Sequence, residues 1–316
     1  MSFKSYEQDA VEQLHSITDF VRWGASQFMA AKLTFGHGTD NAVDEALFLT
    51  LHALYLKPGL SQELMATRLT IAERRAVFEL FRRRVEEKQP LAYLTNEAWF
   101  CGLPFYVDER VLVPRSPISE LIENQFSPWV EQDEVFSVLD MCTGSGCIAI
   151  ACAEAFPDAH IDAVDLSPDA LVVAKINVDT FGLEDQVELL ESNLFEGLVG
   201  RKYDLIVSNP PYVDALDMAA LTDEFKHEPE MGLAAGDDGL DIVVQMLAQA
   251  ENYLTEHGTL VVEVGNSDLA LMQRYPDVPF IWPDFERGGH GIFVLHAETL
   301  REYRKLFEHE ASEYTS

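Results

Sequence analysis

The chain has 316 residues, of which 47% are hydrophobic and 24% are charged, so it is long enough for one large domain and a second, smaller one. Its 54 acidic residues outnumber 22 basic ones, and the net charge of −32 disfavours a non-specific nucleic-acid binder. No apolar run approaches the roughly 18 residues of a transmembrane helix. The N-terminus lacks the basic-then-apolar pattern of a secretory signal.

The acidic surface has two interpretations. It would attract a basic protein partner, and it is equally compatible with a role in solubility or in a salty habitat. The 4 cysteines form no CxxC pair and no cluster with histidine, so we predict a reducing, cytoplasmic setting and no structural metal.

Residues 1–90 have the pattern of a helical domain. An apolar stripe at helical spacing predicts a first helix around residues 14–21. A second helix is predicted over residues 43–56. A third is predicted over residues 70–88, where Gln89-Pro90 ends it.

The third predicted helix begins at Thr70, a residue suited to cap it, and is rich in arginine. These arginines would either bind nucleic acid or face solvent. Glu79 and Arg83, like Arg82 and Glu86, stand at the spacing of surface ion pairs, which favours a solvated face. The arginines concerned are Arg74, Arg75, Arg82, Arg83 and Arg84.

From residue 91 the pattern changes from helical to extended. Residues 92–100 and 105–112 flank Cys101-Gly102-Leu103-Pro104 and predict a β-hairpin. We assign residues 91–115 to this hairpin linker and residues 116–316 to a third segment, the main domain.

In residues 116–316 strands and helices alternate, after a first helix that ends near Phe126. This order predicts an α/β fold with a doubly wound, Rossmann-like parallel sheet, which binds its ligand at the carboxyl ends of the strands. The predicted strands are residues 135–140, 160–165, 187–191, 205–208, 259–264, 278–282 and 291–295.

Residues 138–149 combine the end of a strand, a glycine turn and the start of a helix. Gly144 and Gly146 allow a ligand to approach the backbone closely. Asp165 ends the next predicted strand, where a carboxylate holds ribose hydroxyls. The pattern predicts a nucleoside ligand, and to this point it fits a dinucleotide as well as a methyl donor.

Asp140 favours S-adenosylmethionine over a dinucleotide. An acid at the end of the first strand would repel a pyrophosphate, but it suits a ligand that carries an ammonium and a sulfonium group. Asn193, after the third predicted strand, is placed to contact adenine and fits an ordinary turn equally well.

Asn209-Pro210-Pro211-Tyr212 follows an apolar strand and suits the methylation of an amide or exocyclic amino nitrogen. The lone pair of an amide nitrogen is delocalised into the carbonyl, so the nitrogen is a poor nucleophile. Asn209 offers a side-chain carbonyl and Pro210 a backbone carbonyl as acceptors for its N–H groups. Pro211 keeps Pro210 extended, and Tyr212 offers a ring to the planar group. Orientation and electrostatics would carry such catalysis, and the motif alone does not separate adenine from glutamine.

Further segments complete a family pattern. They are Gly36-His37-Gly38-Thr39-Asp40-Asn41, Ala92-Tyr93-Leu94-Thr95-Asn96, Ala98-Trp99-Phe100-Cys101-Gly102, residues 105–117, His227-Glu228-Pro229-Glu230, Gly232-Leu233-Ala234 and Glu263-Val264-Gly265-Asn266-Ser267. With them, nearly the whole chain resembles the N5-glutamine methyltransferases that modify translation proteins. It is most similar to the branch that acts on large-subunit ribosomal protein three. The sister branch acts on release factors and usually has Gly at Cys142 and a Pro-Arg-Pro-Asp type segment at Pro114-Arg115-Ser116-Pro117.

The resemblance implies a helical domain that recognises the substrate and a catalytic domain that uses S-adenosylmethionine. It implies substrate contacts at Asn209, Pro210, Pro211 and Tyr212, with Asn209 also beside the donor. The family often has Asp at the position of Asn193, so this chain keeps an acceptor there without the charge. The implied donor contacts are Thr143, Gly144, Ser145, Gly146, Asp165, Asn193 and Leu194.

Two other functions share parts of this pattern. An adenine-N6 DNA methyltransferase has the same tetrapeptide and flips its base into a pocket, but the net charge of −32 and the lack of a basic insertion after Tyr212 disfavour stable DNA binding. A ribosome-assembly protein without catalysis would not need an intact glycine turn, Asp165 and tetrapeptide.

Overall fold

The computed structural model of the protein describes residues 3–36 and 38–314, so His37 of the family pattern lies outside it. The chain forms two compact units. The helical unit consists of Met1–Ala98, Val107–Glu109 and Thr222–His227. The sheet unit consists of Trp99–Tyr106, Arg110–Leu221 and Glu228–Ser316.

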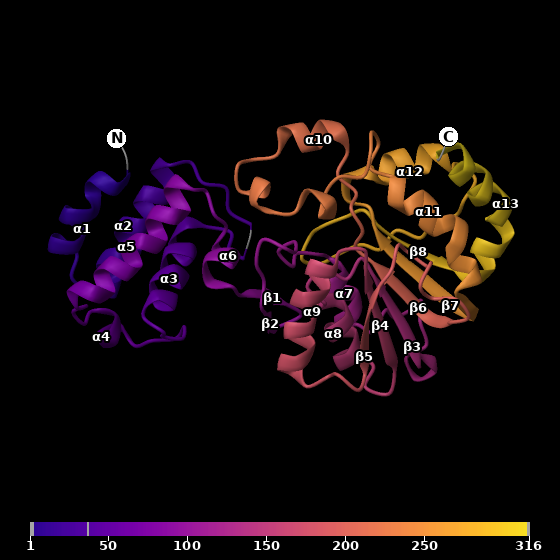
Figure 1. Cartoon of the computed structure of the whole chain (residues 1–316), viewed down its shortest axis with the longest axis horizontal. Coiled ribbons are helices and arrows are strands. Elements are labelled where there is room, and N and C mark those ends of the chain that lie inside the picture. Colours follow the sequence, from indigo (N-terminus) through magenta and orange to yellow (C-terminus); the bar gives the residue numbers. More distant parts are fainter. Residues whose placement is uncertain (1–2, 37, 315–316) are drawn as a thin grey trace. The chain divides into compact units, whose positions relative to one another are not determined.

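Helices make up most of the helical unit (Figure 1). They pack around a core of aromatic and aliphatic side chains, among them Phe20, Phe28 and Phe81. Capping boxes start two of the helices: Ser16 with Asp19, and Thr70 with Glu73. The predicted cap at Thr70 is therefore confirmed. The elements are η1 (Phe3–Tyr6), α1 (Glu7–Gln13), α2 (Ile17–Ala30), α3 (Ala42–Ala53), α4 (Gln62–Met65), α5 (Ile71–Glu86), α6 (Leu91–Thr95) and η3 (Phe225–His227).

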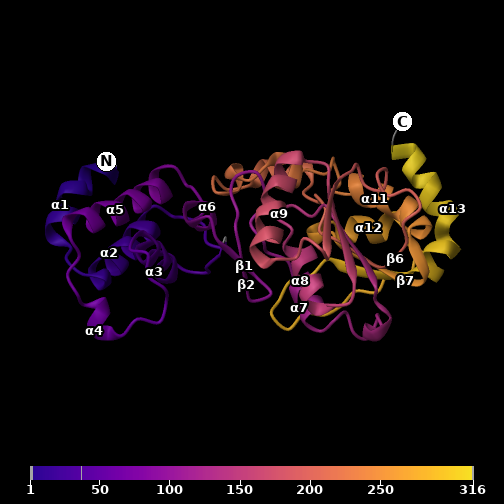
Figure 2. The same cartoon turned by 60° about the horizontal axis from the view of Figure 1, so that its bottom comes forward.

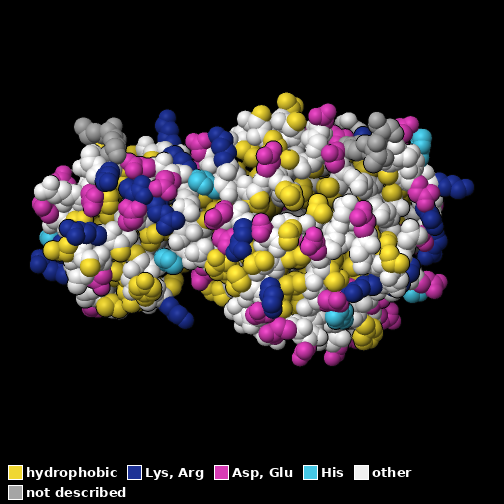
Figure 3. All heavy atoms as spheres, viewed as in Figure 1, with side chains coloured by type: hydrophobic (Ala, Val, Ile, Leu, Met, Phe, Trp, Pro, Cys, Tyr) yellow, Lys and Arg dark blue, Asp and Glu magenta, His cyan; other side chains and the backbone are white. Residues whose placement is uncertain are grey.

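The arginines of α5 divide into two kinds. Arg82 lies on the surface and pairs with Glu79, Glu86 and Glu87, as expected of a solvated face. Figure 3 shows basic and acidic side chains interspersed over this unit. The same expectation is wrong for Arg84, whose side chain is only 1% exposed and pairs with Glu45 at 2.5 Å. The sequence of α5 does not show which of its arginines is buried, because the acidic partners of Arg84 come from distant parts of the chain.

The predicted hairpin is real but shorter than expected. Its strands are β1 (Ala98–Phe100) and β2 (Leu103–Phe105). Residues 92–95, expected to be extended, instead belong to α6, which ends where Asn96 adopts a left-handed φ of 53°. Directly after β2, the backbone N–H of Tyr106 donates a hydrogen bond to the Asn177 side chain at 2.7 Å. This N–H is therefore not used in a strand pairing, and the hairpin ends at Phe105.

The sheet unit has one six-stranded sheet in the order β5-β4-β3-β6-β7-β8. The first five are parallel, and β8 runs antiparallel to β7, which corrects the expected all-parallel sheet. The α/β, Rossmann-like fold class is confirmed. The strands are β3 (Ser137–Met141), β4 (His160–Asp165), β5 (Val187–Glu191), β6 (Tyr203–Ser208), β7 (Leu254–Glu263) and β8 (Ile292–His296).

Helices cover both faces of this sheet (Figures 1 and 2). Alternate strand residues point to opposite faces: Val138 joins the core with α7 and α8, and Leu139 joins the core with α11 and α13. The helical elements are α7 (Ile118–Glu123), η2 (Gln132–Glu134), α8 (Cys147–Ala155), α9 (Pro168–Phe181), α10 (Ala215–Ala220), η4 (Glu230–Gly232), α11 (Asp241–Gln249), η5 (Ala250–Asn252), η6 (Gly265–Ser267), α12 (Asp268–Arg274) and α13 (Ala297–Tyr314).

The strand predicted over residues 278–282 is wrong. Only Ile281 pairs with the sheet, through an isolated bridge to Val294. Pro279 and Pro283 flank this residue, and neither has an N–H to donate to a ladder. No helix within residues 3–36 and 38–314 combines the length and apolarity that crossing a membrane requires.

Candidate active site

The predicted site residues lie at or directly after the carboxyl ends of neighbouring strands of the sheet. The parallel register sets Met141 beside both Val164 and Ser208. The glycine turn after β3, Asp165 at the end of β4 and Asn209 after β6 therefore begin side by side. This edge is formed by the carboxyl ends of the strands, where the fold class places a ligand.

Asp140 supports the glycine turn from inside the protein. Its side chain is fully buried, and Oδ2 accepts hydrogen bonds from the Thr143 hydroxyl at 2.5 Å and the Ala149 N–H at 3.0 Å. Oδ1 is buried without a partner among the described residues. Burial and the nearby Asp165 raise the pKa of Asp140 to about 7, although the hydrogen bonds from Thr143 and Ala149 oppose the rise. A cation beside the turn would favour the ionised carboxylate.

Gly144 and Asp165 are joined directly. The Gly144 N–H donates to Asp165 Oδ2 at 2.9 Å, and the Ser167 N–H donates to Oδ1 at 2.9 Å. Gly144 has a φ of +55°, and a Cβ built there would meet nothing within 4 Å, so the backbone borders open space. Burial raises the pKa of Asp165, while these backbone N–H groups lower it. Each carboxylate oxygen keeps a further acceptor position for a hydroxyl.

The rest of the turn packs against α9. A Cβ at Gly146, where φ is +79°, would lie 3.3 Å from the Ala174 Cβ. The carbonyl of the buried Ser145 accepts a hydrogen bond from the Asn177 side chain at 2.8 Å. Ser145 and Gly146 thus seat the start of α8 closely on α9, which fixes the position of the turn.

The segment after β5 presents a polar and an apolar residue. Asn193 is exposed and donates to Glu196 at 3.0 Å, whereas Leu194 is buried with a left-handed φ of 49°. Leu166, directly after Asp165, is an apolar side chain left 54% exposed. Leu166 gives no signal in the sequence, because an apolar residue at a strand end is ordinarily part of the core.

Asn209 is half-buried, and its side chain makes no hydrogen bond to any residue that the structure describes. The Pro210 carbonyl is also without a partner within residues 3–36 and 38–314. Beyond the tetrapeptide, the Val213 N–H donates to Leu233 at 2.8 Å and its carbonyl accepts from Ala235 at 3.0 Å. These hydrogen bonds fix the chain directly after the tetrapeptide, while the Asn209 side chain and the Pro210 carbonyl remain available as acceptors.

Comparison with known proteins decides the family. Residues 126–236 match the methyltransferase small domain family. The chain is 46% identical over 303 residues to the ribosomal protein uL3 glutamine methyltransferase of Francisella tularensis, and 96% of each chain is covered. It is 50% identical over 302 residues to the protein of that name from Xanthomonas campestris, again with 96% of each chain covered. The chain belongs to the uL3 glutamine methyltransferase family.

A solved methyltransferase from Pyrococcus furiosus shares 18% identity, with 62% of this chain and 89% of that chain covered at a TM-score of 0.44. Membership of the uL3 glutamine methyltransferase family makes this protein an S-adenosylmethionine-dependent methyltransferase, and it confirms the resemblance stated from the sequence. The residues present fit this donor. The Gly144 backbone borders open space, Asp165 has acceptor positions left, and the fully buried Asp140 lies behind the turn.

The methyltransferase has a buried acid beside the tetrapeptide, and this acid was not among the predicted site residues. Glu263, at the end of β7, is 3% exposed, and its Oε1 accepts a hydrogen bond from the Tyr212 hydroxyl at 2.8 Å. Its Oε2 accepts from the Ser116 hydroxyl. Burial raises the pKa of Glu263 to about 7, against the hydrogen bonds from Ser116 and Tyr212 and the charge of Arg115.

Arg115 and Glu228 form a two-pronged ion pair close to this acid. Arg115 Nη1 lies 2.6 Å from Glu228 Oε1, and Nη2 lies 3.0 Å from Oε2. The Glu228 side chain is fully buried. Ser116, Arg115, Glu228 and Glu263 all come from segments that carried the family resemblance, which was the available signal for them. Their spacing in the sequence gives no sign that they meet.

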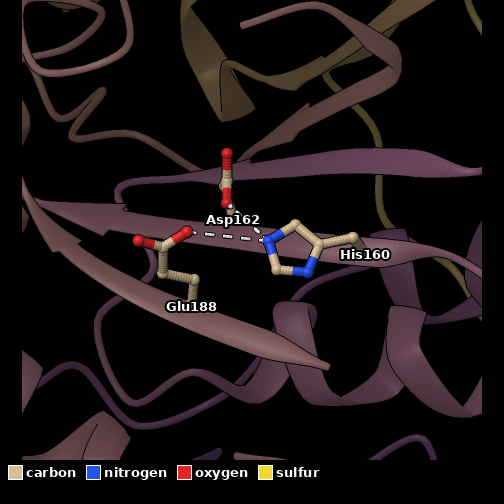
Figure 4. A group of neighbouring side chains, drawn as sticks. All are labelled: His160, Asp162 and Glu188. Atoms are coloured by element: carbon tan, nitrogen blue, oxygen red, sulfur yellow. Dashed lines mark ion pairs between the residues drawn. The ribbon is translucent and has the colours of Figure 1, made fainter. Parts of the chain in front are cut away.

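His160, Asp162 and Glu188 form a group of ionisable side chains elsewhere in the methyltransferase (Figure 4). His160 Nε2 lies 3.2 Å from Asp162 and 3.6 Å from Glu188. Arg201 Nη1 lies 2.6 Å from Asp162 and 2.8 Å from Glu188. A guanidinium already supplies the positive charge between the two carboxylates, so we assign no metal site to this group.

Proposed function

We propose that this enzyme methylates the side-chain amide nitrogen of a glutamine in large-subunit ribosomal protein uL3. The names of the two relatives support this substrate. The observation that carries the chemistry is the half-buried Asn209 side chain, which has no hydrogen-bond partner among the described residues, next to the unpartnered Pro210 carbonyl. Two available acceptors match in number the two N–H groups of a primary amide.

The chemistry is one of orientation. S-adenosylmethionine, when bound, supplies a methyl group on a sulfonium sulfur. The glutamine nitrogen forms a bond to the methyl carbon while the carbon–sulfur bond breaks and its electron pair goes to sulfur. One amide proton then leaves to solvent. Asn209 and Pro210 hold the N–H groups, so the nitrogen presents its face to the methyl group without a nucleophilic residue.

The residues proposed to hold the donor are those at the ends of β3, β4 and β5. Asp165 accepts from ribose hydroxyls, and Leu166 and the Asn193–Leu194 turn border the adenine. Asp140 acts from behind the turn, because it is fully buried and reaches the donor only through its charge and through the residues it fixes. The remaining donor contacts are proposed at Thr143, Gly144, Ser145, Gly146 and Asn209.

Charge supports a protein substrate over DNA. The net charge of −32 attracts a basic ribosomal protein and repels a phosphate backbone. We assign choice of substrate to the helical unit, as the family resemblance implies. We also propose a cytoplasmic location for the enzyme, because its proposed substrate is a protein that enters ribosomes.

The test is methyl transfer from labelled S-adenosylmethionine to isolated uL3, to a release factor and to duplex DNA. We expect label in uL3 alone, located to one glutamine amide by peptide mass spectrometry, and labelling that is about 10²-fold or more slower with Asn209→Ala at matched enzyme concentration. Label in the release factor or in DNA, with uL3 unlabelled, would reject the proposal.

A further inference from the structure

We propose that Glu263 is a positioning residue for Tyr212: its carboxylate holds the tyrosine ring in the orientation that the substrate amide needs. This inference rests on the proposed function and deepens it. Glu263 belongs to β7, whereas the tetrapeptide follows β6, so the two are brought together by the sheet and not by the local sequence.

Both carboxylate oxygens of Glu263 are used, and in the ionised form of Glu263 both of them accept. The Ser116 hydroxyl accepts from the Ile118 N–H at 3.1 Å, so its single hydrogen is free to point to Glu263 Oε2. The Tyr212 hydroxyl donates to Oε1 at 2.8 Å. A carboxylate accepts both hydroxyls, whereas the amide of a glutamine has only one acceptor oxygen and would leave one hydroxyl without an acceptor.

The rest of Tyr212 is held as firmly as its hydroxyl. Its carbonyl accepts from the Ser267 hydroxyl at 3.1 Å. Gly265 has a φ of +47°, and a Cβ there would lie 2.5 Å from the Tyr212 ring. A Cβ at Gly239 would lie 2.3 Å from the Tyr212 carbonyl oxygen. The tyrosine is therefore fixed at its hydroxyl, its ring and its backbone before any substrate arrives.

A carboxylate is an unfavourable choice for a purely structural position. Glu263 is 3% exposed, and a buried charge is destabilising unless its hydrogen bonds are met. The two terminal nitrogens of Arg115, the cation whose charge acts on it, are bonded to Glu228. Two hydroxyls thus offset much of the desolvation, and one belongs to the last residue of the tetrapeptide. An apolar residue would fill the strand end without that desolvation but would not orient the tyrosine.

The test compares Glu263→Gln and Tyr212→Phe, each alone and together, with isolated uL3 as substrate. We expect kcat to fall roughly tenfold to a hundredfold in each single variant, because a small displacement of a reacting group lowers the rate of reaction by about that factor. The Kd for S-adenosylmethionine should stay within about twofold, and the double variant should be no slower than Tyr212→Phe, since both changes break one connection.

A matched control is available in the same sheet. The Tyr203 hydroxyl donates to the buried Asp162 at 2.5 Å, near the other ends of β6 and β4. Asp162→Asn and Tyr203→Phe should lower the melting temperature but leave kcat per folded enzyme unchanged. If they slow transfer as much as Glu263→Gln does, the effect is one of general stability and the inference fails.

The remaining outcomes are also decisive. Wild-type turnover by Glu263→Gln, or effects of Glu263→Gln and Tyr212→Phe that multiply in the double variant, would overturn the positioning role. Should Glu263→Gln not fold, wild-type kcat in Tyr212→Phe would overturn it alone. If the wild-type enzyme does not methylate uL3, the proposed function fails and not the positioning role. Measuring wild-type transfer to uL3 beside the variants separates these two outcomes.

Discussion

Arg84 and Glu224 stand 140 residues apart in the chain, yet Arg84 Nη1 lies 3.2 Å from Glu224 Oε1 in the interior of the helical unit. Arg84 also pairs with Glu45 at 2.5 Å and donates to the Thr34 carbonyl at 2.7 Å. Glu224 in turn accepts from the Thr34 N–H at 2.9 Å. One guanidinium thus joins α5, α3 and the segment Thr222–His227.

This network predicts an unequal effect of two arginines on one helix. Arg84→Met keeps the length of the side chain but leaves two buried carboxylates without their cation, which should cost about 3–5 kcal/mol of unfolding free energy. Arg82→Met removes a surface arginine and should cost roughly 0–1 kcal/mol. Urea denaturation measures both, and similar losses in the two variants would contradict the buried role of Arg84.

The proposed donor site predicts a change in binding at Asp165. Replacing it by alanine removes a charged acceptor for ribose hydroxyls, so the affinity for S-adenosylmethionine should weaken by roughly 1–3 kcal/mol. Asp185, an exposed acid just before β5 at the opposite edge of the sheet, is the control. Titration calorimetry should find Asp185→Ala unchanged. Equal affinities for Asp165→Ala and wild type would remove Asp165 from the donor site.

Asn209 tests the proposed mechanism. Asn209→Ala should bind the donor almost normally but transfer the methyl group about 10²-fold or more slowly, the scale of losing one preorganised hydrogen-bond partner. Asn209→Asp keeps an acceptor but adds a charge that stabilises the sulfonium ground state, so it should also be slow. Single-turnover transfer to isolated uL3 measures both. Near-normal transfer by Asn209→Ala would make the tetrapeptide a structural turn.

Asp140 predicts how stability depends on pH. Its pKa of about 7 in the folded protein lies above its ordinary value of 3.8, so between these values the folded state keeps a proton that the unfolded state releases. The group therefore adds stability as the pH falls from about 7 to about 4, and it costs stability above pH 7.

Asp140→Asn removes that titration. Relative to this variant, the wild-type protein should gain unfolding free energy as the pH is lowered from about 8 to about 4, by an amount on the order of a few kcal/mol. Denaturant unfolding of the two proteins without donor, at matched salt, gives the difference at each pH. A difference that stays constant or shrinks with falling pH would mean that Asp140 is ionised throughout.

The fold was predictable where periodicity is strong and partners are local. The apolar strands of the sheet and the cap at Thr70 follow from neighbouring residues alone. The reversed direction of β8 was not predictable, because strand direction depends on how the chain returns through residues 264–291. Residues 278–282 have the apolar character of a strand, but their prolines leave a single bridging residue.

The candidate site was predictable to a similar degree. Asn209 and Asp165 stand in contiguous motifs with a recognisable order of strand and turn, so sequence alone placed them at strand ends. Glu263 stands in a segment of the family resemblance, but no motif of strand and turn marks it as a site residue. A glutamate that ends an apolar strand is typical of a solvated terminus, and only the pairing of β6 with β7 brings it to Tyr212.

The segment Thr222–His227 belongs to the helical unit, although the chain on both sides of it belongs to the sheet unit. A shuffled gene that fused a foreign N-terminal portion at residue 98 would therefore separate Glu224 from Arg84, its partner in the helical unit. In such a hybrid, the buried Glu224 would lose its pairing with the Arg84 guanidinium. An exchanged N-terminal portion should therefore keep the protein stable only where it supplies a buried cation for Glu224 in place of Arg84.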